Sequence, residues 1–354
     1  SAVKTYDSST SLSGSSVTIT TGITGKTLTY SDATANSANV GSGNYITEIT
    51  LLDGSDLASN YQLPTLNSSN APVTINKKVV SLSAEKVYDG SNQLSTVTVN
   101  TGVGGEFLNY SGATSNSKDV ASASFITAIT LSNGSNGELV SNYELPSLLT
   151  ANSNNSASIS RKVISFSGSP SKVYDGSDTI ASNLVSISTG VGTETLTISN
   201  LKANDANVLG ASFISEATLA NGSNGGNIGN YQLPVLSPLT APFSITPKTV
   251  TLNGGINSKT YDGNVNLSSN QISVSGLVSG ESLSFADITA NSSNFGADNF
   301  IKTITLLNST QGAGLSSNYQ LPTLDKNSAP VVISKAVLTV TANNAQMTYG
   351  DNAL

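Results

Sequence analysis

The sequence predicts an all-β fold, a row of small β-sandwich domains in tandem. Short segments rich in β-branched residues alternate with turns rich in Asn, Gly and Ser, and no segment has a convincing helical period. A set of motifs also recurs along the 354 residues with a period of about 86. Such a period is too long for a solenoid repeat and is typical of an independently folding domain with its own core.

Four motifs define the repeat. The first centres on a Lys-x-Tyr-Asp sequence, the second is Asn-Tyr-x-Leu-Pro, the third is an alternating strand, and the fourth is a large apolar residue 22 to 24 positions after the first tyrosine. They predict units at 1–76, 77–160, 161–246 and 247–334, with 335–354 as either the first strand and turn of a following unit or a closing strand of the fourth. The four markers are, in order, Tyr6, Tyr88, Tyr174 and Tyr261; Tyr61, Tyr143, Tyr231 and Tyr319; Tyr45, Phe125, Phe213 and Phe300; and Tyr30, Tyr110, Ile198 and Phe285.

The strand "FITAITL", which starts at Phe125, shows the strongest alternation. Phe125, Ile129 and Leu131 share one face with Thr127, and Ile126, Ala128 and Thr130 lie on the other. A period of two with one apolar face predicts a strand that is half buried against a core. Six or seven such short strands per unit favour a β-sandwich with Greek-key connections.

The first motif predicts a core anchor followed by a corner. Tyr88 has a ring to bury and a hydroxyl to satisfy, Asp89 can cap its own backbone, and Gly90 accepts positive φ. Ser8 replaces the glycine in the first unit, which suggests that this corner does not require positive φ. The recurring structural positions of this motif are Tyr6 and Asp7; Tyr88, Asp89 and Gly90; Tyr174, Asp175 and Gly176; and Tyr261, Asp262 and Gly263.

Calcium binding is an alternative role for the recurring aspartates. Calcium prefers six to eight oxygen ligands and usually several carboxylates, and we identify no second acid that recurs in step with Asp89. The structural role is therefore the favoured one.

The second motif predicts a tyrosine at a strand entrance, with its hydroxyl bonded back to the chain. Leu63 is expected to fill the core, and Pro64 to end strand pairing. An alternative is an isopeptide crosslink between recurring residues such as Lys86 and Asn142, but that chemistry needs a buried acid, and none recurs except the aspartate of the first motif.

Composition excludes several functions. The chain has no Cys and no His, which removes thiolate and imidazole chemistry, and no base–nucleophile constellation stands out, so we expect no enzyme. Its 15 Lys and Arg residues are scattered and its net charge is −7, which argues against nucleic-acid binding. No run of 18 apolar residues is present, so we expect no membrane insertion by this region.

The repeated motifs resemble the YDG repeat family of large bacterial surface and secreted adhesins. The resemblance is carried by Tyr88-Asp89-Gly90, Asn142-Tyr143-Glu144-Leu145 and Ile159-Ser160-Arg161-Lys162, with equivalents in the other units. The segment from Lys335, "KAVLTVTANNAQMTYGDN", is similar to the start of an MBG domain. The resemblance implies immunoglobulin-like modules in the stalk of an extracellular adhesin involved in aggregation or biofilm, and no cofactor.

Three functions remain open at this level. The first is a stalk that projects a binding head from the bacterial surface, with adjacent domains of the chain as partners. The second is a filament or matrix in which copies are linked by strand addition at exposed edges. The third is a multivalent array that binds surface glycans or matrix polysaccharide weakly, with Tyr30 and Tyr110 as candidate aromatics. Whether the strand before each Lys-x-Tyr-Asp motif opens one domain or closes the previous one also stays open.

Overall fold

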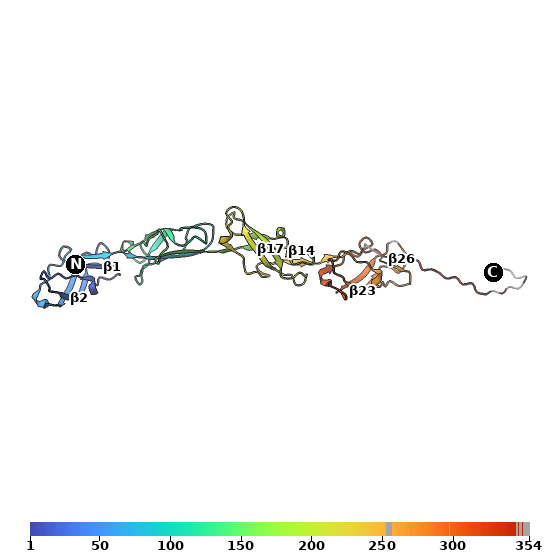
Figure 1. Ribbon diagram of the computed structural model, residues 1–354, viewed down its shortest axis with the longest axis horizontal. Coiled ribbons are helices and arrows are strands. Elements are labelled where there is room, and N and C mark those ends of the chain that lie inside the picture. The colour runs from blue at the N-terminus through green and yellow to red at the C-terminus, as the bar shows by residue number, and fades with distance from the viewer. Residues whose placement is uncertain (253–256, 297, 345, 347–348, 350–354) are drawn as a thin grey trace. The chain divides into compact units, whose positions relative to one another are not determined.

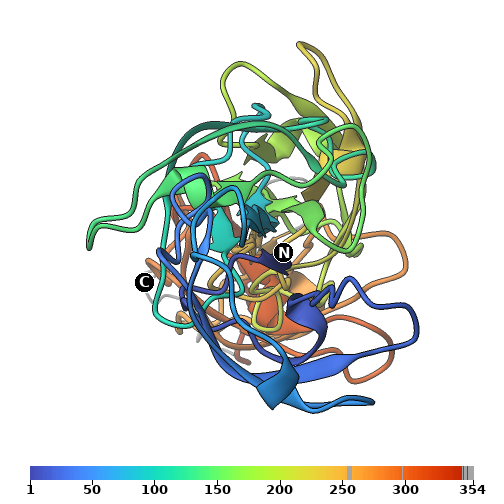
Figure 2. The same cartoon turned by 90° about the vertical axis from the view of Figure 1, so that its left-hand side faces the viewer.

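The computed structural model describes residues 1–252, 257–296, 298–344, 346 and 349. Within these ranges the strands are short and pair into sheets of two or three, and the helical elements are three-residue 3-10 turns. Figures 1 and 2 show these short strands joined by long loops. The predicted all-β fold is therefore confirmed.

The first two repeats contain the elements that define the pattern. Those of the first repeat are β1 Ala2–Thr5, η1 Gly14–Ser16, β2 Leu28–Ala35, β3 Ile46–Asp53, η2 Ala58–Asn60 and β4 Val73–Asn76. Those of the second are β5 Lys78–Val79, β6 Ser81–Val87, β7 Thr98–Asn100, β8 Asn109–Ser115, β9 Ile126–Ser132, η3 Val140–Asn142, β10 Tyr143–Glu144 and β11 Asn155–Ser160.

The third and fourth repeats follow the same order. The third has β12 Lys162–Val163, β13 Ser165–Ser167, β14 Ser171–Val173, β15 Thr179–Ile180, η4 Ser182–Leu184, β16 Ser186–Ser188, β17 Leu196–Ala203, β18 Ile214–Asn221, η5 Ile228–Asn230, β19 Tyr231–Gln232 and β20 Ser244–Thr246. The fourth has β21 Lys248–Thr249, β22 Ser258–Thr260, η6 Ser269–Gln271, β23 Ser284–Ala290, β24 Ile301–Leu307, η7 Ser316–Asn318, β25 Tyr319–Gln320 and β26 Val332–Ser334.

Two pairings recur in every repeat. The strand before the Tyr-Asp turn runs parallel to the last strand of the same repeat, as in β6 with β11, where Lys86 lies opposite Ile159. The alternating strand forms an antiparallel hairpin with the strand that precedes it, as in β8 with β9. The parallel pairs are β1–β4, β6–β11, β14–β20 and β22–β26, and the hairpins are β2–β3, β8–β9, β17–β18 and β23–β24.

The short strand at each repeat boundary belongs to the repeat that follows it. β5 pairs in parallel with β10, so that Lys78 lies opposite Tyr143, and β6 continues directly from it. β12 with β19 and β21 with β25 repeat this arrangement. These boundary strands place the tyrosine of the Asn-Tyr motif beside the start of its own repeat.

The hydrophobic core is not interrupted at every repeat boundary. One core cluster runs continuously from Ala2 to Ala157, through the first two repeats, and a second runs from Tyr174 to Ile333. The chain separates into two compact units, of which the first holds residues 1–163, 189–195 and 221–232 and the second holds the remainder. The expectation of a separate core in each repeat was therefore wrong, because side chains at the junctions join neighbouring cores.

The last described stretch has no strand. Residues 335–344 form no regular element, and Val337, Leu338 and Val340 are almost fully exposed. Most of the expected turn that echoes the first motif lies outside the described residues, apart from Tyr349. In the described part of the chain, no helix has the length and apolar character needed to span a bilayer.

Candidate functional site at the repeat junctions

The tyrosines of the first two motifs meet at one carboxylate. Tyr6 of the first repeat donates its hydroxyl proton to Glu106 Oε1 at 2.7 Å, and Tyr143 of the second repeat donates to Glu106 Oε2 at 2.5 Å. The two rings pack edge to face, with centroids 5.3 Å apart and an interplanar angle of 76°. The first-motif tyrosine of one repeat is thus bound by the next repeat, an arrangement that we call the clamp.

The same clamp occurs three times. Tyr88 and Tyr231 donate to the two oxygens of Glu194 at 2.8 and 2.6 Å, within the first compact unit. Tyr174 and Tyr319 donate to those of Glu281 at 2.5 and 2.6 Å, within the second. All six tyrosines are at most 4% exposed. Both oxygens of each half-buried glutamate thus accept a charge-assisted bond from a buried tyrosine.

The clamp makes its tyrosines hard to ionise. Burial is the main cause, and the hydrogen bond to the neighbouring glutamate and its negative charge act in the same direction. Together they raise the pKa of Tyr6 and of Tyr319 to about 12. The pKa values of Tyr88, Tyr143, Tyr174 and Tyr231 are raised as well, for the same leading reasons.

A buried asparagine forms a second link at each junction. Asn142, which is 1% exposed, accepts from the backbone N–H of Val40 at 2.9 Å and donates to Asn39 Oδ1 at 2.8 Å, both in the preceding repeat. Asn230 makes equivalent bonds to Val120 and Asp119, and Asn318 to Val208 and Asn207. The Asn-Tyr dipeptide therefore contributes both of its side chains to the junction.

The left-handed residue of the first-motif turn also lies at the junction. Gly90 and Gly176 have φ of +84° and +80°, and a Cβ at either position would lie 2.8 Å from a valine of the next repeat, Val191 or Val278. Ser8 adopts the same left-handed conformation, with φ of +63°. The inference that this corner does not require positive φ was therefore wrong: the serine accepts the strained conformation.

The recurring lysine and aspartate hold the turn itself. Lys172 Nζ, on a side chain only 8% exposed, lies 2.8 Å from Asp175 Oδ1 and also donates to the carbonyls of Ser177 and Thr179. The same carboxylate accepts from the backbone N–H of Ser177. Equivalent lysine–aspartate pairs at 2.6 to 2.7 Å join Lys4 to Asp7, Lys86 to Asp89 and Lys259 to Asp262.

This arrangement assigns the aspartate a shaping role. In Asp175, burial would raise the pKa, but the hydrogen bonds from Lys172 and Ser177 outweigh it and lower the pKa below its ordinary value. The charged partner of this carboxylate is thus the ammonium group of Lys172. Among the residues the structure describes, no cluster of three or more acids is arranged to hold a metal.

Two tyrosines of the recurring set lie outside a clamp. Tyr61 of the first repeat is half-buried and donates to Asp56 Oδ2 at 3.0 Å. Tyr261 of the fourth repeat is 43% exposed. Tyr261 is the first-motif tyrosine, which elsewhere requires a following repeat, and Tyr61 is the second-motif tyrosine, which elsewhere lies against a preceding one. Both departures fit a role at the junction rather than in the core of a single repeat.

One further expectation was wrong, and two pairs of candidate residues have defined partners. Leu63 is 37% exposed instead of filling the core. Lys86 and Asn142, considered for a crosslink, bind different partners, in the turn and in the preceding repeat respectively. The hydroxyls of Tyr30 and Tyr110 bind the backbone of the loop that precedes their strand, through Val17 and Val97 among others.

Sequence reasoning missed the glutamates of the clamp. Glu106, Glu194 and Glu281 each stand four positions before the fourth marker, so their recurrence was visible. The recurrence is incomplete, because the first repeat has Lys26 at this place. One partner tyrosine lies 37 or 38 residues after each glutamate and the other lies 100 to 107 residues before it, so the spacing gave no additional local cue.

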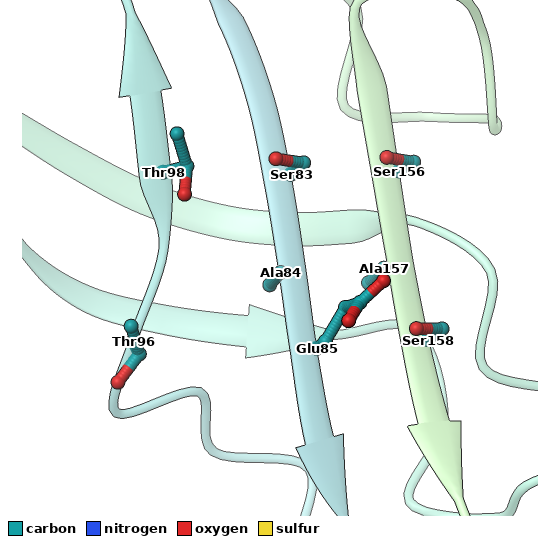
Figure 3. Close-up of a pocket in the computed structure, with 8 residues that line it drawn as sticks. All are labelled: Ser83, Ala84, Glu85, Thr96, Thr98, Ser156, Ala157 and Ser158. Carbon is teal, nitrogen blue, oxygen red and sulfur yellow. The ribbon is translucent and has the colours of Figure 1, made fainter.

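A groove on the second repeat offers little chemistry. It lies over the sheet of β11, β6 and β7, and Figure 3 shows Glu85 reaching from β6 toward β11 among small hydroxyl side chains. Its lining residues are Ser83, Ala84, Glu85, Thr96, Thr98, Ser156, Ala157 and Ser158. The junctions, which recur and use the motif residues, are the stronger candidate site.

Fold and site together define a tandem-repeat, all-β protein whose successive repeats are joined by buried polar clamps. Comparison with known protein families identifies the YDG domain twice, at residues 160–241 and 246–329, so the third and fourth repeats are YDG domains. The first two repeats build the same pairings and junctions from the same motifs. No characterised protein and no solved structure is significantly similar to the chain.

Proposed function

We propose that this chain is the stalk region of an extracellular bacterial adhesin, where its YDG repeats act as a spacer between the cell surface and a binding head. The partner of each repeat is its neighbour in the chain, and the recurring residues have no catalytic role. The observation that carries the proposal is the threefold occurrence of the clamp, which uses the most regularly repeated side chains for coupling rather than for a solvent-facing site.

The chemistry of the clamp suits a spacer. Buried polar groups stabilise less than an apolar contact of equal size, but they are satisfied in only one arrangement. Glu106 bound by two tyrosines, together with Asn142 bound to Asn39, specifies how one repeat meets the next. We infer that these links limit bending at the junction, which lets an array transmit force and hold distance.

We also propose that each repeat is an immunoglobulin-like sandwich. Leu82 of β6 and Ile126 and Ile129 of β9 belong to one core cluster, although their strands lie in different sheets. This supports two sheets that face each other across that core. An experimental structure of the chain tests this point, since the sandwich requires the β6 sheet and the β8–β9 hairpin to pack face to face.

Cell-surface labelling tests the stalk role. Antibodies raised against the repeats should label intact cells of the producing bacterium, and external protease should remove the signal. Deleting one or more whole repeats from the chromosomal gene should reduce cell aggregation or attachment, while a control deletion strain complemented with the full gene recovers it. Labelling that appears only after lysis, or adhesion that is independent of the repeats, would overturn the proposal.

A further inference from the structure

The first and last strands of a repeat are placed so that tension along the chain shears them. In the first repeat β1 pairs in parallel with β4, from Ala2 opposite Val73 to Thr5 opposite Asn76. The start of β1 and the end of β4 lie at opposite ends of this pair. Tension applied before β1 and after β4 therefore slides the two strands past each other and loads their evenly spaced hydrogen bonds together.

The clamp holds the far end of the first strand. Tyr6 directly follows β1, its N–H donates to the carbonyl of Asn76 at 2.9 Å, and its hydroxyl donates to Glu106 of the second repeat at 2.7 Å. The second repeat is thus attached to both strands at this end: to β4 through the backbone that joins β4 to β5, and to β1 through the clamp. Tyr88 after β6 and Tyr174 after β14 repeat this arrangement.

Two routes therefore carry tension from the first repeat to the second. One crosses the β1–β4 ladder and continues along the backbone, and it fails when the strands slide. The other runs along β1 and through the buried ring of Tyr6 to the carboxylate of Glu106. A hydrogen bond to a charged group is roughly twice as strong as a neutral one, so this bond is not minor beside those of the ladder. While it holds, β1 is fixed at both ends and cannot slide along β4.

We propose that the clamp is a load-bearing contact, in which the glutamate of one repeat increases the resistance of the preceding repeat to forced unfolding by blocking the slide of its first strand. This inference deepens the proposed stalk function and rests on it, since a stalk is under tension between the cell surface and a binding head. Each junction then has a second connection besides the backbone. The mechanical strength of a repeat depends in part on a residue of its neighbour.

The direction of pulling distinguishes load bearing from ordinary stabilisation. The chain has no Cys, so two introduced cysteines provide unique attachment points. In a shearing geometry they are Ser1→Cys and Lys77→Cys, before β1 and after β4. In an unzipping geometry Lys77→Cys is replaced by Ser69→Cys, on the turn before β4, and all three positions are exposed. The ladder then opens one bond at a time from the starts of both strands, and the clamp at its far end carries no load until the ladder is open.

Constant-force spectroscopy of the full chain tests the proposal, because forced unfolding is governed by the unfolding rate. Tyr6→Phe keeps the ring and removes only the hydroxyl that reaches Glu106. In the shearing geometry we expect it to unfold the first repeat at least about tenfold faster, a factor equivalent to about 1.4 kcal/mol. In the unzipping geometry its rate should stay within about twofold of the unaltered chain, since the clamp is not loaded there. Glu106→Ala, although it lies in the second repeat, should show the same dependence on geometry.

Tyr30→Phe is the matched control. It also removes a tyrosine hydroxyl from the first repeat, but one that bonds to Val17 and Gly14 of that same repeat. Its effect on the unfolding rate should be similar in the two geometries. If Tyr6→Phe behaves like this control, or leaves the rate in the shearing geometry unchanged, the proposal is overturned. Because the measurement uses purified protein, its failure is distinct from a failure of the cell-surface labelling that tests the stalk role.

Discussion

Replacing Glu281 by alanine should open the junction between the third and fourth repeats. The substitution removes both acceptors of the clamp and leaves the hydroxyls of Tyr174 and Tyr319 without their carboxylate. A hydrogen bond to a charged group contributes about 1.5–3 kcal/mol. Two such bonds at the lower limit, taken because neighbouring contributions are not additive, give a loss of about 3 kcal/mol.

Backbone hydrogen exchange measures this loss of stability at the junction. The N–H of Val278 donates to the Tyr319 hydroxyl at 2.9 Å, and that of Val208 donates to Asn318 Oδ1 at 2.9 Å. A loss of about 3 kcal/mol corresponds to a fall in protection of roughly 100-fold at both amides, if they exchange by opening of the junction. Local measurement is needed because a chain of several units does not unfold in one step.

Glu216→Ala is the matched control. Glu216 lies in the same compact unit, its side chain is 54% exposed, and it forms a surface ion pair with Lys202 at 2.7 Å. Surface pairs of this kind contribute little, so protection at Val208 and Val278 should stay near that of the unaltered chain. If Glu281→Ala also leaves both amides as protected as the control does, the clamp does not hold the junction and the reasoning is refuted.

Three further outcomes follow from the same geometry. The pKa of Tyr319 is raised from 10.0 to about 12, so its contribution to the free energy of unfolding should be complete below pH 10 and lost as the pH rises through 12. Ultraviolet titration should show this late ionisation. A single tyrosine transition near pH 10 would contradict it. Gly176→Ala should lower the thermal denaturation midpoint more than Gly263→Ala. Both glycines have φ near +80°, but only a Cβ at Gly176 would meet a valine, Val278. Equal decreases would contradict this close contact. Asp175→Asn should weaken the turn by no more than about 1 kcal/mol, because its carboxylate is half exposed and screened. Because the pKa of Asp175 is lowered in the folded chain, its contribution to stability should be present above pH 3.8 and lost as the solution is acidified below that value. If Asp175→Asn leaves the dependence of stability on pH unchanged in the acid range, this expectation is wrong.

The strands could be predicted from the sequence because their signal is local. Alternation in "FITAITL" predicted the strand β9, but it put Ile126 and Ile129 on opposite faces, whereas both are buried. The buried tyrosines were also predicted, since a regularly repeated aromatic residue in a polar chain needs a place to pack. Which repeat each ring packs against could not be predicted, because the period of a sequence is the same whether Tyr88 lies within one repeat or between two.

The clamp was harder to predict for a physical reason. Glu194 is joined to residues 106 positions before it and 37 after it, and no local pattern encodes such pairs. The substitution of Lys26 in the first repeat hid the recurrence further. Ser8 misled in a similar way, since residue type alone suggested an ordinary φ where the neighbouring bonds of Asp7 and Lys4 impose a left-handed one.

A double-mutant cycle across one repeat boundary tests the central claim most directly. Tyr174→Phe and Glu281→Ala, made singly and together, should show a coupling of about 1–2 kcal/mol in the opening free energy of the Val208 amide, because each removes one side of a single bond between successive repeats. Additive effects, within about 0.5 kcal/mol, would mean that the two residues act independently and that the clamp does not join the repeats.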